Sequence, residues 1–166
     1  ELGKLSVHDL QKVKGIGETK ATIIAAALEL GRRRELSTPL DRVCVRRSSE
    51  IANYLKVLLK DYNYEVFAVI FLNRANKIKH FEIMSRGGIT GTVADPRLIL
   101  KKALEKDATS IVLSHNHPSG NLMPSRADEE ITRKIKQAAS YFDINVIDHI
   151  IVSEEGYYSF ADEGVI

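Results

Sequence analysis

The order of apolar and polar positions divides most of the chain into interleaved helical and extended segments. Residues 48–62 carry apolar side chains at helical spacing, which predicts an amphipathic helix. Residues 65–73 (EVFAVIFLN) form a short, continuous apolar run, which predicts a buried strand. Further strands are predicted over residues 78–84, 109–114, 144–153 and 157–160, helices over 96–106 and 126–141, and a Gly-rich loop or frayed strand over 86–93. The alternation predicts an α/β domain with a mixed β-sheet flanked by helices.

The first residues follow a different pattern. Ser6-x-x-Asp9 predicts the start of a helix over residues 6–14, Gly15 and Gly17 interrupt it, and a second helix is predicted over residues 18–34. Pro39 cannot lie inside a helix, so residues 36–41 are predicted to be a linker. The chain is therefore predicted to contain a small all-α module (1–35), a linker (36–41) and the α/β domain (42–166).

Composition excludes few functions. No apolar run approaches the roughly 20 residues that span a bilayer, so no membrane contact is expected. The single cysteine, Cys44, lies between two valines; it is expected to be a buried strand thiol and fits a reducing, cytoplasmic compartment. The net charge is +2, and its excess of Lys and Arg over Asp and Glu falls within residues 1–35, which hints at an anionic partner.

The stretch SHNHPSGNLMPSRAD (114–128) begins where a predicted strand ends, a common place for ligands in α/β sheets. In an extended segment, the spacing of His115 and His117 points both imidazoles to one side. Asp128 is expected in the first turn of the next helix. Two His and one Asp would leave one position of a tetrahedral zinc open for water, as in catalytic sites. The alternative is structural, because Ser125-x-x-Asp128 is also an ordinary helix cap.

These residues carry a resemblance. HNHPSGNLMPSRAD resembles the JAMM motif of MPN-domain metalloproteases, and with EVFAVIFLN before it and DHIIVS after it the chain resembles the bacterial RadC (UPF0758) family. The resemblance implies a JAMM/MPN fold similar to that of cytidine deaminases. It implies one zinc per chain held by His115, His117 and Asp128, Ser125 as oxyanion stabiliser, and Glu65 as general base. Glu82 is the alternative base.

The function that this resemblance implies is a zinc-dependent hydrolase, a metallopeptidase or isopeptidase acting on a peptide or isopeptide substrate. The alternative is a DNA-associated repair or recombination accessory protein, whose JAMM domain is a scaffold or acts on a non-peptide substrate. A metal-dependent nuclease fits less well, because a single three-ligand site lacks the extra carboxylates of two-metal chemistry. Exposed strand edges would permit a homo-oligomer.

Residues 13–21 (VKGIGETKA) resemble a helix-hairpin-helix, which implies non-specific DNA binding through Lys14, Gly15, Gly17 and Lys20. The alternative is a glycine turn that only packs two helices.

Asn116 and Asp148 are expected to play supporting parts. Asn116 is expected to brace the loop after the strand. Asp148 is expected to accept a hydrogen bond from a ligand histidine or from backbone, and His149 is not expected to bind metal.

Overall fold

The structure is a computed structural model that describes residues 2, 5–35, 44–87 and 94–166. The chain divides into two compact units, residues 1–39 and 40–166, and each is described by itself. The predicted linker (36–41) and residues 88–93 of the predicted Gly-rich loop lie outside the described residues. In the part of the chain that is described, no helix is both long and apolar enough to cross a bilayer.

The first unit contains two helices, α1 (Val7–Gln11) and α2 (Glu18–Glu35). The prediction for the second helix is confirmed to within a residue. The first ends at Gln11 rather than Lys14, because the chain tightens into i→i−3 backbone bonds there and then turns through Gly15, whose φ is +91°. That left-handed conformation strongly favours glycine. The two helices form a small helical part.

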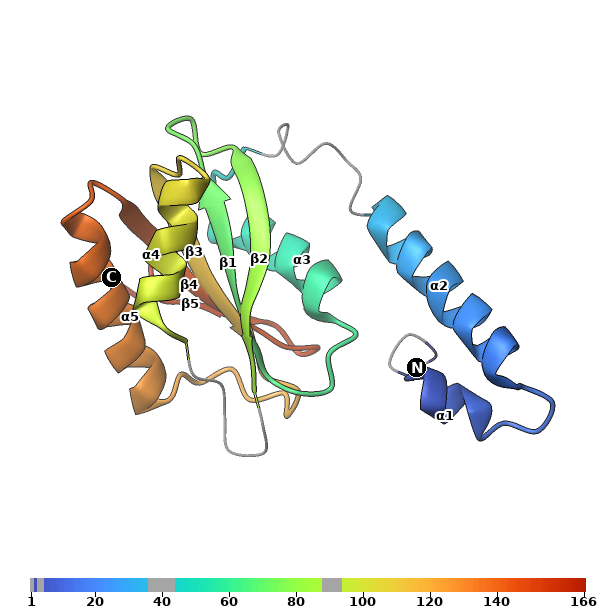
Figure 1. Cartoon of the computed structure of the whole chain (residues 1–166). Helices are drawn as coiled ribbons and strands as arrows, with labels where there is room; N and C mark the ends of the chain where they lie inside the picture. Colours follow the sequence, from blue (N-terminus) through green and yellow to red (C-terminus); the bar gives the residue numbers. More distant parts are fainter. Residues whose placement is uncertain (1, 3–4, 36–43, 88–93) are drawn as a thin grey trace. The chain divides into compact units, whose positions relative to one another are not determined.

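The second unit is a mixed sheet with helices on both faces, which confirms the predicted fold class (Figure 1). Its elements are α3 (Ser48–Leu59), β1 (Val66–Leu72), β2 (Ile78–Arg86), α4 (Pro96–Glu105), β3 (Ser110–Asn116), α5 (Arg126–Ser140), β4 (Asn145–Val152) and β5 (Tyr157–Ser159). The strands lie in the order β2-β1-β3-β4-β5, and of the contacts between these strands only that of β3 with β4 is parallel.

The central strands are buried on both faces, which explains their continuous apolar sequence. Every residue of β1 and β3 is buried. Helices α4 and α5 cover one face, where Ile99 and Ile135 pack against Phe67, Val69 and Leu113. Helix α3 covers the other face over β4 and β5. Burial of an aliphatic side chain such as these stabilises the fold by about 1.5–3 kcal/mol.

A β-bulge in β4 decides which of its side chains face α5. Ile111 pairs with Val146, but the next residue, Val112, pairs with Asp148, so one residue of β4 is skipped. After this bulge His149, not Asp148, lies on the face that carries Val146.

Asp148 consequently lies on the opposite face. Its carboxylate accepts hydrogen bonds from the backbone N–H of His149 (2.7 Å) and of Ala161 (3.1 Å), and from the Ser159 hydroxyl (2.7 Å). Burial raises the pKa of Asp148 despite these bonds. Of the two roles expected for Asp148, the backbone role is the one observed.

Cys44 differs from its prediction. It forms an isolated bridge with Lys77 and is only partly buried, with its thiol 3.4 Å from the Ala75 carbonyl oxygen. The flanking valines therefore misled the prediction of a buried strand thiol.

Candidate metal centre

His115 is held rigidly near the end of β3. Its Cα pairs with Phe67 of β1 on one side and with Ile151 of β4 on the other. The Phe67 ring stacks on the imidazole with 8° between their planes, and His115 is only 3% exposed. Its Nδ1 lies 2.9 Å from Nε2 of His149, and its Nε2 faces His117 and Asp128.

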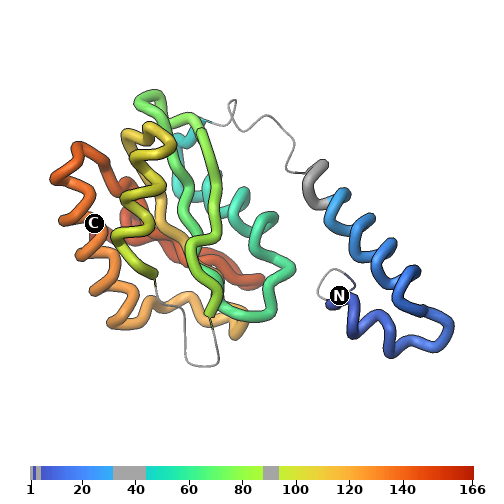
Figure 2. Tube along the Cα trace, in the orientation of Figure 1, coloured from blue at the N-terminus to red at the C-terminus, as the bar shows by residue number. Residues whose placement is uncertain are grey.

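His117 directly follows β3 in the sequence. Figure 2 traces the loop that leads from β3 into α5. The backbone N–H of His117 donates to the Val152 carbonyl (2.9 Å), and its Nδ1 lies 2.5 Å from the Asn121 carbonyl oxygen. Because a carbonyl oxygen can only accept, Nδ1 must carry the proton. Nε2 of His117 is therefore the unprotonated nitrogen of the neutral ring.

Asp128 uses its two carboxylate oxygens differently. Oδ2 accepts from the backbone N–H (2.7 Å) and hydroxyl (2.6 Å) of Ser125, the N-cap of α5. Oδ1 lies 3.4 Å from Nε2 of His115. Both readings of Ser-x-x-Asp are therefore compatible: one oxygen completes a capping box, and the other faces the histidines.

The same motif in the first unit provides a comparison. Ser6 and Asp9 form an identical capping box at α1. There the second oxygen of Asp9 accepts from the Lys12 ammonium at 2.7 Å, on the surface. The capping box is thus a local consequence of the Ser-x-x-Asp sequence. The group that contacts the other carboxylate oxygen depends on the fold around it.

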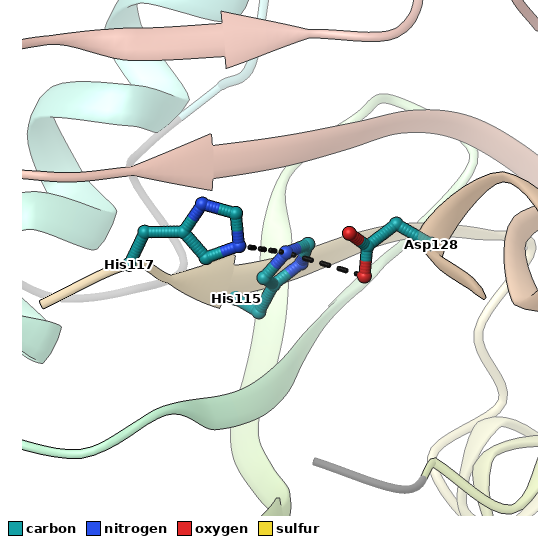
Figure 3. Close-up of side chains that lie close together, drawn as sticks. All are labelled: His115, His117 and Asp128. Atoms are coloured by element: carbon teal, nitrogen blue, oxygen red, sulfur yellow. Dashed lines mark hydrogen bonds and ion pairs between the residues drawn. The ribbon is translucent and has the colours of Figure 1, made fainter. Parts of the chain in front are cut away.

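The three side chains converge on one point (Figure 3). Nε2 of His115 lies 3.0 Å from Nε2 of His117, and one ligand atom from each of the three residues lies within 4.8 Å of the others. Zinc bonds of about 2.0–2.1 Å imply ligand atoms roughly 3.3 Å apart at the corners of a tetrahedron. The two distances that involve His115, 3.0 and 3.4 Å, bracket that value. The residues therefore fit a metal ion.

The electrostatics of the group favour cation binding. Burial acts to raise the pKa of Asp128, but the His115 contact and the Ser125 hydrogen bonds outweigh it and hold that pKa well below its usual range. Full burial, together with the neighbouring His115, lowers the pKa of His149 well below its ordinary value. Asp128 is thus a carboxylate and His149 a neutral imidazole near pH 7.

Glu65 directly precedes Val66, the first residue of β1. Its backbone carbonyl accepts from the Gly87 N–H at 2.8 Å. Phe67 pairs with His115 in antiparallel register, and the same register, continued past the end of the ladder, would place Glu65 across from His117, on the face of the Phe67 ring. Glu65 is partly buried there.

Glu82, the alternative base, lies elsewhere on the sheet. It pairs with Val69, one pleat further along β1 than Phe67. Its carboxylate contacts the His80 imidazole (3.1 Å) and the Lys102 ammonium (3.4 Å). The Glu82 carboxylate is thus paired with His80 and Lys102, and the choice of Glu65 as the base stays a prediction.

Asn116 fixes the segment that carries Glu65. Its Oδ1 accepts from the Val66 N–H (2.8 Å), and its Nδ2 donates to the carbonyls of Tyr62 (3.3 Å) and Tyr64 (3.1 Å). Asn116 therefore faces away from the histidines, as expected from the sequence, but it braces the segment before β1 rather than the loop after β3. Ser114 shares that face and does not reach the site.

Replacing Asn116 by Ala should destabilise the protein by about 2–4 kcal/mol, because it leaves a buried N–H and two carbonyls without their partner. Urea unfolding followed by circular dichroism measures the loss as a lower midpoint. The matched control is Asn121→Ala, in an exposed loop, which should shift the midpoint much less. Equal midpoints for Asn116→Ala and wild type would show that this brace is not needed.

The four residues predicted to contact DNA lie around the turn of the first unit. Lys14, Gly15 and Gly17 are exposed, and the Lys20 ammonium donates to the Gly15 carbonyl at 3.1 Å. Lys20 therefore helps to hold the turn closed. Phosphate binding at this turn stays a prediction.

Two residues behind the site were not predicted to take part in it. The Thr132 hydroxyl donates to the Asp128 carbonyl and lies 2.6 Å from Nδ1 of His149, which in turn contacts His115. Thr132 lies one helical turn after Asp128, so i, i+4 spacing was the only available hint. The position of His149 behind His115 depends on the bulge in β4, which no residue pattern in the sequence predicts.

Similarity to other proteins agrees with this geometry. Residues 45–165 match the family described as RadC-like JAB domain. A UPF0758 protein of Flavobacterium johnsoniae is 46% identical over 164 residues, which cover 99% of this chain and 72% of that protein. A UPF0758 protein of Streptococcus sanguinis is 39% identical over 98% of this chain and 72% of its own length. The chain therefore belongs to the RadC-like JAB-domain family of UPF0758 proteins.

Proposed function

We propose that this protein is a zinc-dependent hydrolase of the JAMM type that cleaves a peptide or isopeptide bond. The observation that carries the proposal is the convergence of His115, His117 and Asp128 within 4.8 Å. Two imidazoles and one carboxylate are ligands typical of zinc, and three protein ligands leave a position for water.

Bound zinc would lower the pKa of a water molecule toward neutrality and polarise the substrate carbonyl. Glu65 would accept a proton from the attacking water and pass it to the leaving amine. Its place directly before β1, two residues from Phe67, which pairs with His115, supports this role.

Ser125 would stabilise the negative charge that develops on the carbonyl oxygen. Its hydroxyl donates to Asp128 in the structure, so the hydrogen has to rotate away from that carboxylate to reach a substrate. The Ser125 oxygen also accepts from the Asp128 N–H at 3.2 Å, which holds the hydroxyl in place while its hydrogen turns.

The proposal is tested by a substrate screen on the purified full chain. Metal analysis should find close to one zinc per chain. Peptide and isopeptide-linked libraries, read by mass spectrometry, should yield products that disappear after chelation and return with added zinc. A zinc-loaded protein that cleaves no member of either library would argue against a peptidase, and would favour a scaffold or a non-peptide substrate.

A further inference from the structure

A chain of hydrogen bonds runs behind His115 through the interior of the domain. Nδ1 of His115 lies 2.9 Å from Nε2 of His149, and Nδ1 of His149 lies 2.6 Å from the Thr132 hydroxyl oxygen. That hydroxyl also bonds the backbone carbonyl of Asp128. Thr132 is 1% exposed and His149 0%, so water does not compete for these bonds.

The donor and the acceptor in each of these hydrogen bonds follow from the last acceptor of the chain, the Asp128 carbonyl. The Asp128 carbonyl oxygen can only accept, so the single hydrogen of the Thr132 hydroxyl points there. The Thr132 oxygen must then accept from His149, and Nδ1 of His149 carries a proton.

His149 is fully buried, and a dry site of this kind favours the neutral ring. A neutral imidazole with its proton on Nδ1 accepts at Nε2, so Nδ1 of His115 is the donor. Nε2 of His115 is then the nitrogen available to a metal ion, on the side of His117 and Asp128.

We propose that Thr132 and His149 are positioning residues that set the tautomer of His115, so that its Nε2 lone pair faces the metal site. The same Thr132 hydroxyl anchors the backbone of Asp128, and one side chain therefore aligns two of the three residues in the group. The inference rests on the metal site of the proposed function, but not on any hydrolytic activity.

Thr132→Val removes the hydroxyl at nearly constant volume. Without the Thr132 hydroxyl, the N–H at Nδ1 of the buried His149 has no acceptor. Moving the proton to Nε2 gives it one, because Nε2 can donate to His115. The proton of His115 then moves to Nε2, and a metal ion must displace it. Residues that support metal ligands typically contribute about 10–100-fold in affinity, and a loss in that range is expected here.

The test measures zinc affinity of the full chain by competition with a chromogenic chelator. Thr132→Val should bind zinc about 10–100-fold more weakly, and Thr132→Ser, which keeps the hydroxyl, should restore most of that loss. Thr22→Val is the matched control, because the Thr22 hydroxyl makes the same bond to the carbonyl four residues earlier (Glu18), at an exposed position of α2. It should leave zinc affinity unchanged.

Nitrogen-15 NMR of the zinc-free protein reads the tautomer directly. At pH about 8, above the ordinary histidine pKa, wild type should show His115 protonated on Nδ1, and Thr132→Val should show it protonated on Nε2. Unchanged zinc affinity in folded Thr132→Val, or a wild-type His115 protonated on Nε2, would overturn the inference. If Thr132→Val does not fold, the wild-type spectrum decides. Neither readout requires a substrate, so a failure of the proposed hydrolase would be seen separately.

Discussion

Glu65→Gln should lower the rate of hydrolysis by about 10²–10⁴-fold on any substrate that the wild type cleaves, because a general base contributes about that much. The amide keeps the size of the carboxylate but cannot accept the proton from water. Zinc content should stay close to one per chain, since Glu65 is not among the three converging residues. Single-turnover kinetics together with metal analysis on the same samples measure both quantities.

Glu82→Gln is the matched control for this change. It is the same substitution, made on a carboxylate that contacts His80 and Lys102. Its rate should stay near that of wild type. Full activity in Glu65→Gln, or a large loss confined to Glu82→Gln, would show that the base has been assigned to the wrong residue.

His117→Ala should abolish stable zinc binding. Loss of a direct ligand should weaken affinity by more than the roughly 100-fold upper range for supporting residues. His117 is partly exposed in a loop, so its truncation leaves little buried space and the melting temperature of the zinc-free protein should change little. Metal analysis after dialysis against a weak chelator, with thermal unfolding alongside, separates lost ligation from lost folding.

His80→Ala provides the comparison for His117→Ala. His80 is another partly exposed histidine, and it contacts Glu82 on β2 rather than the three-residue group. Zinc content should be unaffected by this change. A His117→Ala protein that still contains one zinc per chain would mean that the metal does not bind at the three-residue group.

Much of the fold was predictable because the hydrophobic pattern reports burial directly. The continuous apolar run at residues 65–73 became β1, buried over its whole length. Asp95 caps α4 through its side chain, with Pro96 as the first helical residue. The end of α1 was harder to predict from the sequence. The residues after Gln11 could continue a helix, and Gly15 is the first residue whose type favours a turn.

The candidate site was predictable where its residues are close in sequence. His115, His117, Ser125 and Asp128 lie within one strand, one loop and one helical turn, so local spacing was enough to bring them together as a hypothesis. The sequence left capping and metal binding open for Asp128. The structure shows that a carboxylate with two oxygens need not choose between a cap and a neighbouring histidine.

The surroundings of His115 were not predictable, because they depend on register between distant strands. Regular alternation from Val146 would have put Asp148 on the face of α5 and His149 behind it. The bulge reverses the two, so a buried imidazole rather than a carboxylate backs His115. A slip of a single residue changes which side chain faces a site, and sequence periodicity does not report it.

The capping box at the start of α5 has a consequence for how such a protein would behave when metal is scarce. The bonds between Ser125 and Asp128 belong to the helix itself, and Ser6 and Asp9 form the same bonds without any histidine nearby. Zinc fingers collapse when stripped of their ion, because the ion is what folds them. Here the helix itself positions the carboxylate. Without zinc the protein would therefore remain folded and able to bind the ion again, instead of unfolding and becoming a substrate for proteases.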